Sequence, residues 1–364
     1  MSEQIRNPHS AFRNREMRFE FYHDGLAGVP KLSVDGTVDD ALHLSHWEGN
    51  ATPEELRADT STEIALNFVA WPRRAEWAGG VDLVTNNHFD TDGVLSVWTV
   101  LAGERALDLR AELVAAAEAG DFSEFPGERA VRASILLQGG DNPFVEGVNS
   151  PLARRLAGGE EVGEARAYEL VLPEVERVLT RTDDYEPLWR EGWDRIERAL
   201  ESFARGDSRV AEDAESRLSV VTLAPGLYGE GGFDPARHAA PFTALAHHAR
   251  GDVFLVATPL AGGWSYRIDH PYHSWAVTTR RPRVERRDLS ALVERLNELE
   301  GSGAAGWKTD RGELTSVVKF LGEDGLQAAS RLRPDEVAAE LRQALKTPVE
   351  RRPEAAPGDA GLQA

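Results

Sequence analysis

The sequence predicts an α/β protein with a mainly parallel sheet, flanking helices and a smaller C-terminal α/β domain. Two β-type runs, 31–36 and 81–85, each precede a segment in which apolar residues have helical spacing. This alternation is typical of a parallel sheet with crossover helices. A long acidic and Arg-rich stretch, 165–205, has Leu, Val, Trp and Ile at three- and four-residue spacing, which predicts a helical connector.

The first half contains several predicted helices. Thr52-Pro53 indicates a helix start, with Thr as the N-cap and Pro at the first helical position. Residues 59–63 indicate a second start, with Asp59 as the expected N-cap, which leads into an apolar run from Ile64. A buried helix is expected at 94–101 and an Ala-rich helix at 107–119.

Domain boundaries follow from the composition. A break at Gly206-Asp207 and a polar run to Ser216 predict two domains, 18–205 and 216–346. The second domain has a set of expected strands and helices: strands at 218–223, 254–257 and 275–278, and helices at 289–299 and 334–345. The polar residues 1–17 and the Pro-, Ala- and Gly-rich residues 347–364 are expected to be disordered.

The composition excludes several kinds of partner and site. The formal net charge is −20, which argues against extended nucleic acid or an anionic membrane surface as a partner. The chain has no cysteine, so any metal must be held by Asp, Glu, His and carbonyl oxygen. The polar start and the lack of a long apolar run predict a cytoplasmic protein. A homodimer is compatible with the sequence, although no specific feature indicates one.

The segment 88–93, His-Phe-Asp-Thr-Asp-Gly, is the strongest candidate for a functional site. It follows a predicted strand and precedes an apolar helix, and sites in parallel α/β sheets form at the carboxyl ends of strands. In an extended stretch His88, Asp90 and Asp92 lie on one side. Two carboxylates and an imidazole suit a divalent ion such as Mn²⁺ or Mg²⁺, which would polarise a phosphoryl oxygen and acidify water. The alternative is a solvated turn in which the carboxylates cap the helix.

Two family resemblances compete for this segment. Residues 90–95 resemble the first motif of haloacid-dehalogenase-type phosphatases, which would make Asp90 the nucleophile and Asp92 the acid/base. That family runs its strand directly into the first Asp, whereas residues 85–88 intervene here. The pattern His88-x-Asp90-x-Asp92-Gly93, followed by a helix with the small residue Ser96, is similar to the first motif of the DHH phosphoesterase superfamily.

A second segment, upstream, has a partial likeness to the same superfamily. Residues 42–50 and 59–64 resemble the region of its His pair and the helix start that follows. The resemblance implies metal-binding roles for His46 and Asp35, with Asp35 as the bridging ligand. The order differs from that of the superfamily, in which the His-x-Asp-x-Asp motif comes first. Residues 83–95 could instead correspond to the last metal motif of the superfamily. Outside the resemblance, His46 could be a buried hydrogen-bonded histidine and Asp35 a turn residue.

The C-terminal half has a cluster of positive charge. DHH proteins often have a second domain that binds substrate phosphate with Arg and a glycine-rich loop. Residues 278–283 and the loop 301–308 resemble these features in order, although the usual His after the glycines is replaced by Trp307-Lys308. The resemblance implies that Arg280, Arg281, Arg283 and Lys308 bind phosphate. A solvated basic turn and a linker are the alternative.

These observations predict a metal-dependent phosphoesterase-like hydrolase acting on a phosphate-containing small molecule or nucleotide. Asp90 and Asp92 would be its catalytic residues. The predicted ligands of Mn²⁺ or Mg²⁺ are His88, Asp90, Asp92, Asp35 and His46. Two alternatives remain: a nonhydrolytic nucleotide- or phosphate-binding protein with a degenerate site, and a haloacid-dehalogenase-like phosphatase.

Overall fold

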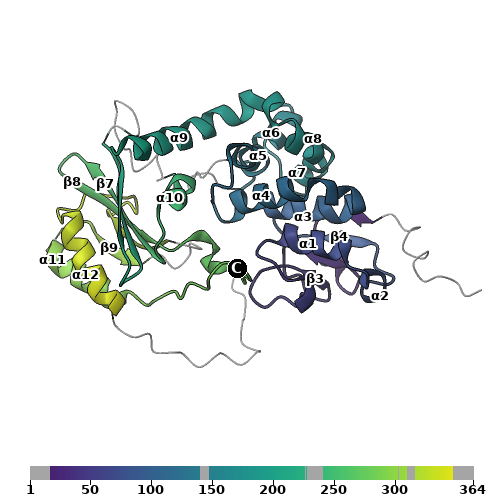
Figure 1. Ribbon diagram of the computed structural model, residues 1–364, viewed down its shortest axis with the longest axis horizontal. Coiled ribbons are helices and arrows are strands. Elements are labelled where there is room, and N and C mark those ends of the chain that lie inside the picture. Colours follow the sequence, from purple (N-terminus) through teal and green to yellow (C-terminus); the bar gives the residue numbers. More distant parts are fainter. Residues whose placement is uncertain are drawn as a thin grey trace, which may run out of the picture.

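A computed structural model describes residues 17–139, 147–225, 227, 241–301, 303–309 and 316–346 of the chain. Two α/β units, each built on its own sheet, lie side by side (Figure 1). This architecture confirms the predicted fold class. The expected disordered ends, 1–17 and 347–364, lie outside the described residues except for Met17. None of the helices in the described ranges has the length and apolar character needed to cross a membrane.

The first sheet is entirely parallel. It has four short strands in the order β1-β4-β2-β3, with bounds Arg18–Phe19, Leu83–Thr85, Leu32–Val34 and Leu42–Leu44. All residues of β2 and β4 are buried, as expected for strands covered on both faces. The runs 31–36 and 81–85 were predicted as strands, whereas β1, which has two residues, and β3, in which His43 interrupts the apolar run, were not.

Helices of the first unit enclose this sheet in one apolar core. In α3, ten consecutive residues from Thr91 to Val100 are buried, so this helix is central to the unit. The helices are α1 (Ser61–Ala70), α2 (Arg74–Trp77), α3 (Thr91–Ala102), α4 (Arg110–Asp121), α5 (Glu128–Gln138), α6 (Pro151–Leu156), α7 (Glu164–Val171), α8 (Val175–Thr180) and α9 (Glu186–Arg205).

The connector α9 joins the two cores. Its buried residues Trp189, Trp193, Ile196 and Ala199 follow three- and four-residue spacing, as the sequence predicted for the connector. The first part packs with the core of the first unit, and Ala199 packs with the second sheet. The Gly206 C-cap has left-handed backbone (φ 78°), which ends the helix at the expected break.

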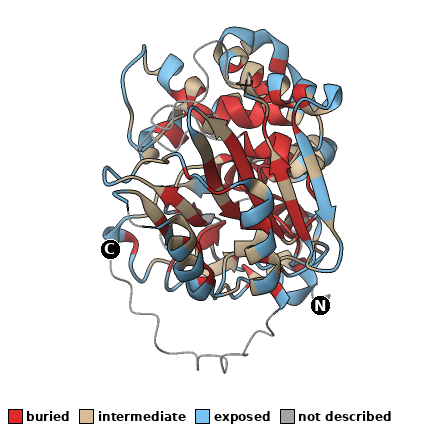
Figure 2. Cartoon of the chain, turned by 90° about the vertical axis from the view of Figure 1, so that its left-hand side faces the viewer, coloured by how far each residue is buried: buried red, intermediate tan, exposed pale blue. Residues whose placement is uncertain are grey.

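The second sheet has six strands and is mixed. Its order is β5-β6-β7-β8-β10-β9, and within this sheet β6 and β7 form the one parallel pair among the described strands. Helices α11 and α12 pack on one face, whereas α10 and the end of α9 pack on the other. From the side of the second unit, the central strands are buried and the outer helix faces are exposed (Figure 2). The bounds are β5 (Arg209–Asp213), β6 (Leu218–Thr222), β7 (Val253–Leu260), β8 (Gly263–Asp269), β9 (Gly306–Thr309), β10 (Ser316–Leu321), α10 (Phe242–His248), α11 (Ser290–Glu300) and α12 (Pro334–Lys346).

Three local predictions were wrong. The expected strand 275–278 is instead the end of a 3-10 helix, Tyr272–Trp275, followed by a non-β segment. The expected helix at Thr52-Pro53 is one 3-10 turn, Glu54–Leu56, because the Thr52 hydroxyl donates to the Ser45 carbonyl instead of capping a helix. Strand β5 lies inside the stretch 206–216 that was expected to be a boundary, so the second unit begins earlier than residue 216.

One segment of the second unit reaches across to the first. Residues 271–284, which we call the strap, follow β8 and precede α11 (Figure 1). Within the strap, Arg281 forms ion pairs with Asp59, Glu118 and Glu124 of the first unit, at 2.7, 2.9 and 2.5 Å. Arg281 and its partners are largely shielded from water, so these contacts are screened less than surface pairs.

We expect Gly120→Ala to destabilise the first unit. A Cβ at Gly120 would overlap the side chain of Thr91 at the start of α3. The expected loss is about 1–3 kcal/mol in the free energy of unfolding, measured by urea denaturation. Gly163→Ala is the matched control, because its Cβ would meet nothing within 4 Å. An equal effect of both substitutions would contradict tight packing at Gly120.

The Arg281–Glu124 contact predicts a pH dependence of stability. Burial alone would raise the pKa of Glu124, but the hydrogen bond and charge of Arg281 outweigh it and lower this pKa to about 2. A carboxyl with a lowered folded-state pKa stabilises the fold above its unfolded value, about 4.5, and this contribution declines as pH falls toward 2. Glu124→Gln should therefore cost about 1–3 kcal/mol at pH 6 and progressively less below pH 4.5. A difference from the native protein that is constant between pH 6 and 3 would refute this.

Candidate metal centre

Three neighbouring strands bring polar side chains to the same edge of the first sheet. Asp35 directly follows β2, His46 comes two residues after β3, and His88 comes three residues after β4. Because β4, β2 and β3 are adjacent and parallel, their carboxyl ends meet at one edge. The sheet therefore brings the late segment 88–93 beside the early residues Asp35 and His46, although they lie far apart in the sequence.

Asp35 has an unusual backbone conformation. Its φ is 66°, in the left-handed region that non-glycine residues seldom adopt. The turn is held by Asp35 N–H, which donates to the Leu44 carbonyl at 3.0 Å, and by the Ser45 hydroxyl, which donates to the Asp35 carbonyl at 2.8 Å. A side chain at Gly36 would overlap Asn87. Such strain at a fully buried acid is typical of functional sites.

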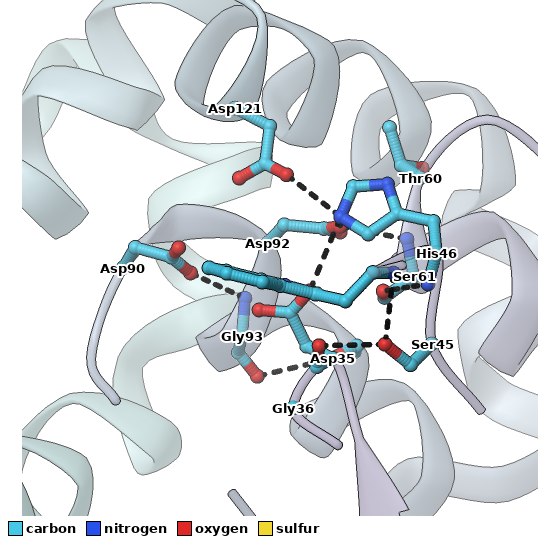
Figure 3. Close-up of polar contacts among 12 residues, drawn as sticks. Asp35, Gly36, Ser45, His46, Thr60, Ser61, Asp90, Asp92, Gly93 and Asp121 are labelled. Carbon is cyan, nitrogen blue, oxygen red and sulfur yellow. Dashed lines mark hydrogen bonds and ion pairs between the residues drawn. The ribbon is translucent and has the colours of Figure 1, made fainter. Parts of the chain in front are cut away.

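The first cluster consists of Asp35, His46, Asp92 and Asp121, all buried (Figure 3). His46 Nε2 lies 3.1 Å from Asp121 Oδ2, 3.4 Å from Asp35 Oδ1 and 3.7 Å from Asp92 Oδ2. The opposite ring nitrogen, Nδ1, is 2.6 Å from the Asp59 carbonyl, which can only accept a hydrogen bond. Nδ1 therefore has the proton, and in the neutral ring the lone pair of Nε2 faces the three carboxylates, the usual arrangement of a metal-binding histidine.

Several polar atoms of this cluster have no hydrogen bond. Among the residues that the structure describes, Asp35 Oδ1, His46 Nε2 and Asp121 Oδ2 are buried without a hydrogen-bond partner. Buried polar atoms normally have partners, since leaving one unpaired costs about 1–3 kcal/mol. Here the unpaired atoms lie close together and are all donors of electron pairs. The cluster is therefore compatible with a bound divalent cation.

A second cluster shares Asp35. It consists of Asp35, His88 and Asp90, with His88 Nε2 at 2.9 Å from Asp35 Oδ2 and 3.3 Å from Asp90 Oδ2. The side chains of His88 and Asp90 are 27% and 23% exposed, so this cluster faces water more than the first. Asp35 presents Oδ1 to the first cluster and Oδ2 to the second, so its carboxylate could bridge two ions.

The proximity of these acids shifts their pKa values in opposite directions. Burial, followed by the negative charge of Asp35, raises the pKa of Asp92 to about 7. Burial and the charges of Asp92 and Asp90 raise that of Asp121 well above its usual range. For Asp35, burial would raise the pKa, but the charges of His88 and His46 and the hydrogen bond from His88 outweigh burial and lower it. Perturbation of this kind is typical of functional sites.

The same acids raise the pKa values of the two imidazoles. Burial would lower the pKa of His88, but the charges of Asp90 and Asp35 raise it to about 12. The nearby Asp121 and Asp35 likewise outweigh burial and raise the pKa of His46. In the absence of a cation, the acids thus retain protons on the imidazoles. A bound divalent ion would replace those protons with its own charge.

Backbone amides orient the two aspartates of the 88–93 segment. Asp90 Oδ1 accepts from Gly93 N–H at 2.7 Å and caps α3, so the alternative prediction of a helix cap is correct for this oxygen. Asp92 instead accepts from the first N–H groups of α1, those of Ser61 at 2.6 Å and Thr62 at 2.8 Å. The positive end of α1 therefore stabilises the ionised form of Asp92.

Two tryptophans cover the clusters. The Trp275 ring contacts that of His46, with centroids 4.9 Å apart, and the Trp47 ring contacts that of His88 at 5.3 Å. The two indoles also contact each other at 4.6 Å. Trp47 comes from the first unit and Trp275 from the strap, so the second unit contributes to the surroundings of the site.

The predicted phosphate-binding residues are dispersed. Arg280 pairs with Glu63 at 2.6 Å, and Arg281 is held by the three carboxylates described above. Arg283 is exposed on the strap, and Lys308 is exposed on β9, at an edge of the second sheet. Ser302 of the glycine-rich loop lies outside the described residues. The structure does not gather these four side chains into one site, and phosphate binding by them stays a prediction.

The sequence did not predict three residues of the site. Asp121 ends α4, one residue after Gly120, and the predicted helix stopped at residue 119. Tyr168 is fully buried and donates to the His88 carbonyl at 2.9 Å, while it accepts from Asn86 at 3.0 Å. Trp275 was assigned to a strand. Gly120 was the one available signal, because a glycine inside an Ala-rich helix indicates close packing.

Comparison with known proteins gives one family. A family model matches residues 16–350, which is most of the chain. No curated protein matches the chain. The protein with this buried Asp/His cluster therefore belongs to DUF6687, a family of unknown function.

Proposed function

We propose that this chain is a divalent-metal-dependent hydrolase that cleaves a phosphate ester of a small molecule or nucleotide. The main support is the pair of clusters that share the buried carboxylate of Asp35. Paired sites of this kind are common in phosphatases and nucleases, where two ions act on one phosphoryl group. The resemblance of residues 88–93 to the first DHH motif agrees with this proposal.

The donor atoms favour Mn²⁺ or Mg²⁺. The clusters offer carboxylate oxygens from Asp35, Asp90, Asp92 and Asp121 and one imidazole nitrogen each from His46 and His88. Carboxylate oxygen suits both ions, whereas imidazole favours Mn²⁺ over Mg²⁺. When bound, such an ion would polarise a phosphoryl oxygen and lower the pKa of water.

The chain's own residues would divide the remaining work. The buried Asp35, His46, Asp92 and Asp121 would hold an ion away from bulk water. His88 and Asp90 lie on the more exposed side, where a substrate can arrive. Without a cation, the charges of His46 and His88 are balanced by the neighbouring carboxylates, so the clusters leave no free positive charge for a phosphate and we expect substrate binding to depend on metal.

A nonhydrolytic phosphate- or nucleotide-binding protein is the second candidate. The observation in its favour is that the likeness to the DHH motifs is incomplete, because the segment Ser45-His46-Trp47 lacks the Asp and one of the two His residues of that superfamily. Such a protein would bind nucleotide saturably and release it unchanged. The haloacid-dehalogenase-like alternative would instead use Asp90 as nucleophile and tolerate substitution of Asp35 or His46.

Metal content is the direct test of the centre. After loading with Mn²⁺ and desalting, the native protein should retain one or two ions per chain by mass spectrometry. Asp35→Asn should lose them all, because Asp35 belongs to both clusters. Asp108→Asn, at an exposed acid, is the control. If native protein and Asp35→Asn both retain almost no Mn²⁺ after the same loading and desalting, the proposed metal centre is refuted.

Asp121→Asn should separate metal binding from stability. The substitution removes a buried acid, so the metal-free variant should be more stable than metal-free native protein by about 1–3 kcal/mol. The same variant should lose the increase in melting temperature that Mn²⁺ gives the native protein. A variant that is both less stable and equally stabilised by Mn²⁺ would contradict a role for Asp121 as ligand.

Turnover tests the reaction itself. Native protein with Mn²⁺ should hydrolyse at least one member of a panel of phosphomonoesters, phosphodiesters and short oligonucleotides. His46→Ala should reduce kcat/KM at least about 100-fold if His46 holds the ion. Saturable nucleotide binding without turnover would favour the nonhydrolytic candidate. Full activity of His46→Ala, with loss in Asp90→Asn, would favour the haloacid-dehalogenase-like one.

A further inference from the structure

The strap contacts the metal-ligand candidate His46 directly. Val277 N–H donates to the His46 carbonyl at 2.8 Å, and the Trp275 ring meets the His46 ring edge-on. The backbone and one ring surface of His46 are therefore held by residues from the second unit. The nitrogen that faces the carboxylates, Nε2, remains without a hydrogen bond.

Asp59 links the strap to the other ring nitrogen of His46. Its carboxylate accepts from the N–H groups of Thr279 at 2.6 Å and Arg280 at 2.8 Å, and it pairs with Arg281 at 2.7 Å. Its carbonyl is the acceptor of His46 Nδ1–H. The expected role of Asp59 as a helix N-cap is wrong, because Thr60 caps α1. Asp59 is fully buried and connects the strap with the orientation of the imidazole.

Arg281 also contacts both sides of Asp121. Glu118 precedes Asp121 by one helical turn and Glu124 follows it by three residues, and the Arg281 guanidinium pairs with both. The guanidinium lies 4.8 Å from the ring centroid of Phe122, which in turn packs against the His46 ring at 5.9 Å. The end of α4, where Asp121 lies, is thus fixed by the strap.

We propose that the strap is a positioning element of the metal centre, so that docking of the second unit and binding of metal are coupled. This inference rests on the metal centre proposed above. With the strap docked, His46 and Asp121 are ordered before an ion arrives. With the strap released, binding must also supply the conformational entropy of ordering them, which weakens affinity. The coupling is reciprocal, so metal in turn favours the docked strap.

The substitution Arg281→Gln tests this coupling, because a simple charge effect and a loss of positioning predict opposite changes in Mn²⁺ affinity. The substitution removes a positive charge beside the clusters, and a simple charge effect would make Mn²⁺ bind more tightly. Loss of positioning predicts the opposite, and we expect about tenfold weaker Mn²⁺ binding by calorimetry on the full-length protein. Arg342→Gln is the matched control, because Arg342 forms a comparable 2.7 Å pair with Asp213 inside the second unit. Its Mn²⁺ affinity should equal that of the native protein.

Proteolysis of the native protein measures the reciprocal effect. Mn²⁺ should slow tryptic cleavage within 280–283 about tenfold. This measurement uses the native protein and needs no variant. Unchanged or tighter Mn²⁺ binding by Arg281→Gln, or equal cleavage of the strap with and without bound Mn²⁺, would overturn the coupling and leave the metal centre intact. A native protein that binds no Mn²⁺ would overturn both.

Discussion

The buried carboxylate of Asp35 is the constraint on which the rest of the site depends. It is inaccessible to water, stands on a left-handed backbone and has one oxygen toward each histidine. Its surroundings add the buried acids Asp92 and Asp121. Concentrating acids in a low-dielectric interior is costly unless charge of the opposite sign is present. The two imidazoles and the amides of α1 offset part of that cost, but Asp35 Oδ1 and Asp121 Oδ2 remain without a hydrogen bond.

The sheet topology is what makes this concentration possible. Strand β4 lies beside β2 although three helical or turn segments and β3 separate them along the chain. A crossover of this kind is ordinary in parallel sheets, where sequence order and spatial order need not agree. The order of these segments along the chain therefore does not prevent their side chains from meeting at one edge of the sheet.

Most residues of the two clusters were predicted as candidates because strand ends have a local signature. Asp35 and His88 follow short β-type runs, and the alternation in 88–93 marks Asp90 and Asp92. Asp121 has no such signature, since an acid at the end of an Ala-rich helix is ordinary in any protein. Its place in the cluster comes from tertiary packing, in which Gly120 lies against Thr91 at the start of α3.

In the strap, by contrast, a clear sequence signal led to a wrong prediction. Trp275 to Thr278 has the apolar, β-branched composition of a strand, yet the described backbone-to-backbone hydrogen bond from this run to the first unit, Val277 N–H to the His46 carbonyl, belongs to no sheet. The density of arginine at 280–283 indicated an anion, and an anion is present, but it is the protein's own Asp59, Glu118 and Glu124. Local composition shows that a charge needs a partner and cannot show whether that partner is a ligand or another part of the chain.

This distinction bears on how a phosphate could be recognised at all. In a chain of net charge −20, the arginines nearest the clusters are neutralised by carboxylates, and the clusters themselves are acidic. On the His88–Asp90 side, the more exposed one, the charge of His88 is balanced by Asp35 and Asp90, so a free anion would find no net positive charge there. Divalent ions held by the two clusters would supply that positive charge. Metal would then act as the anion-binding element as well as the source of Lewis acidity, and affinity for a phosphate ester would follow metal occupancy rather than the number of basic side chains.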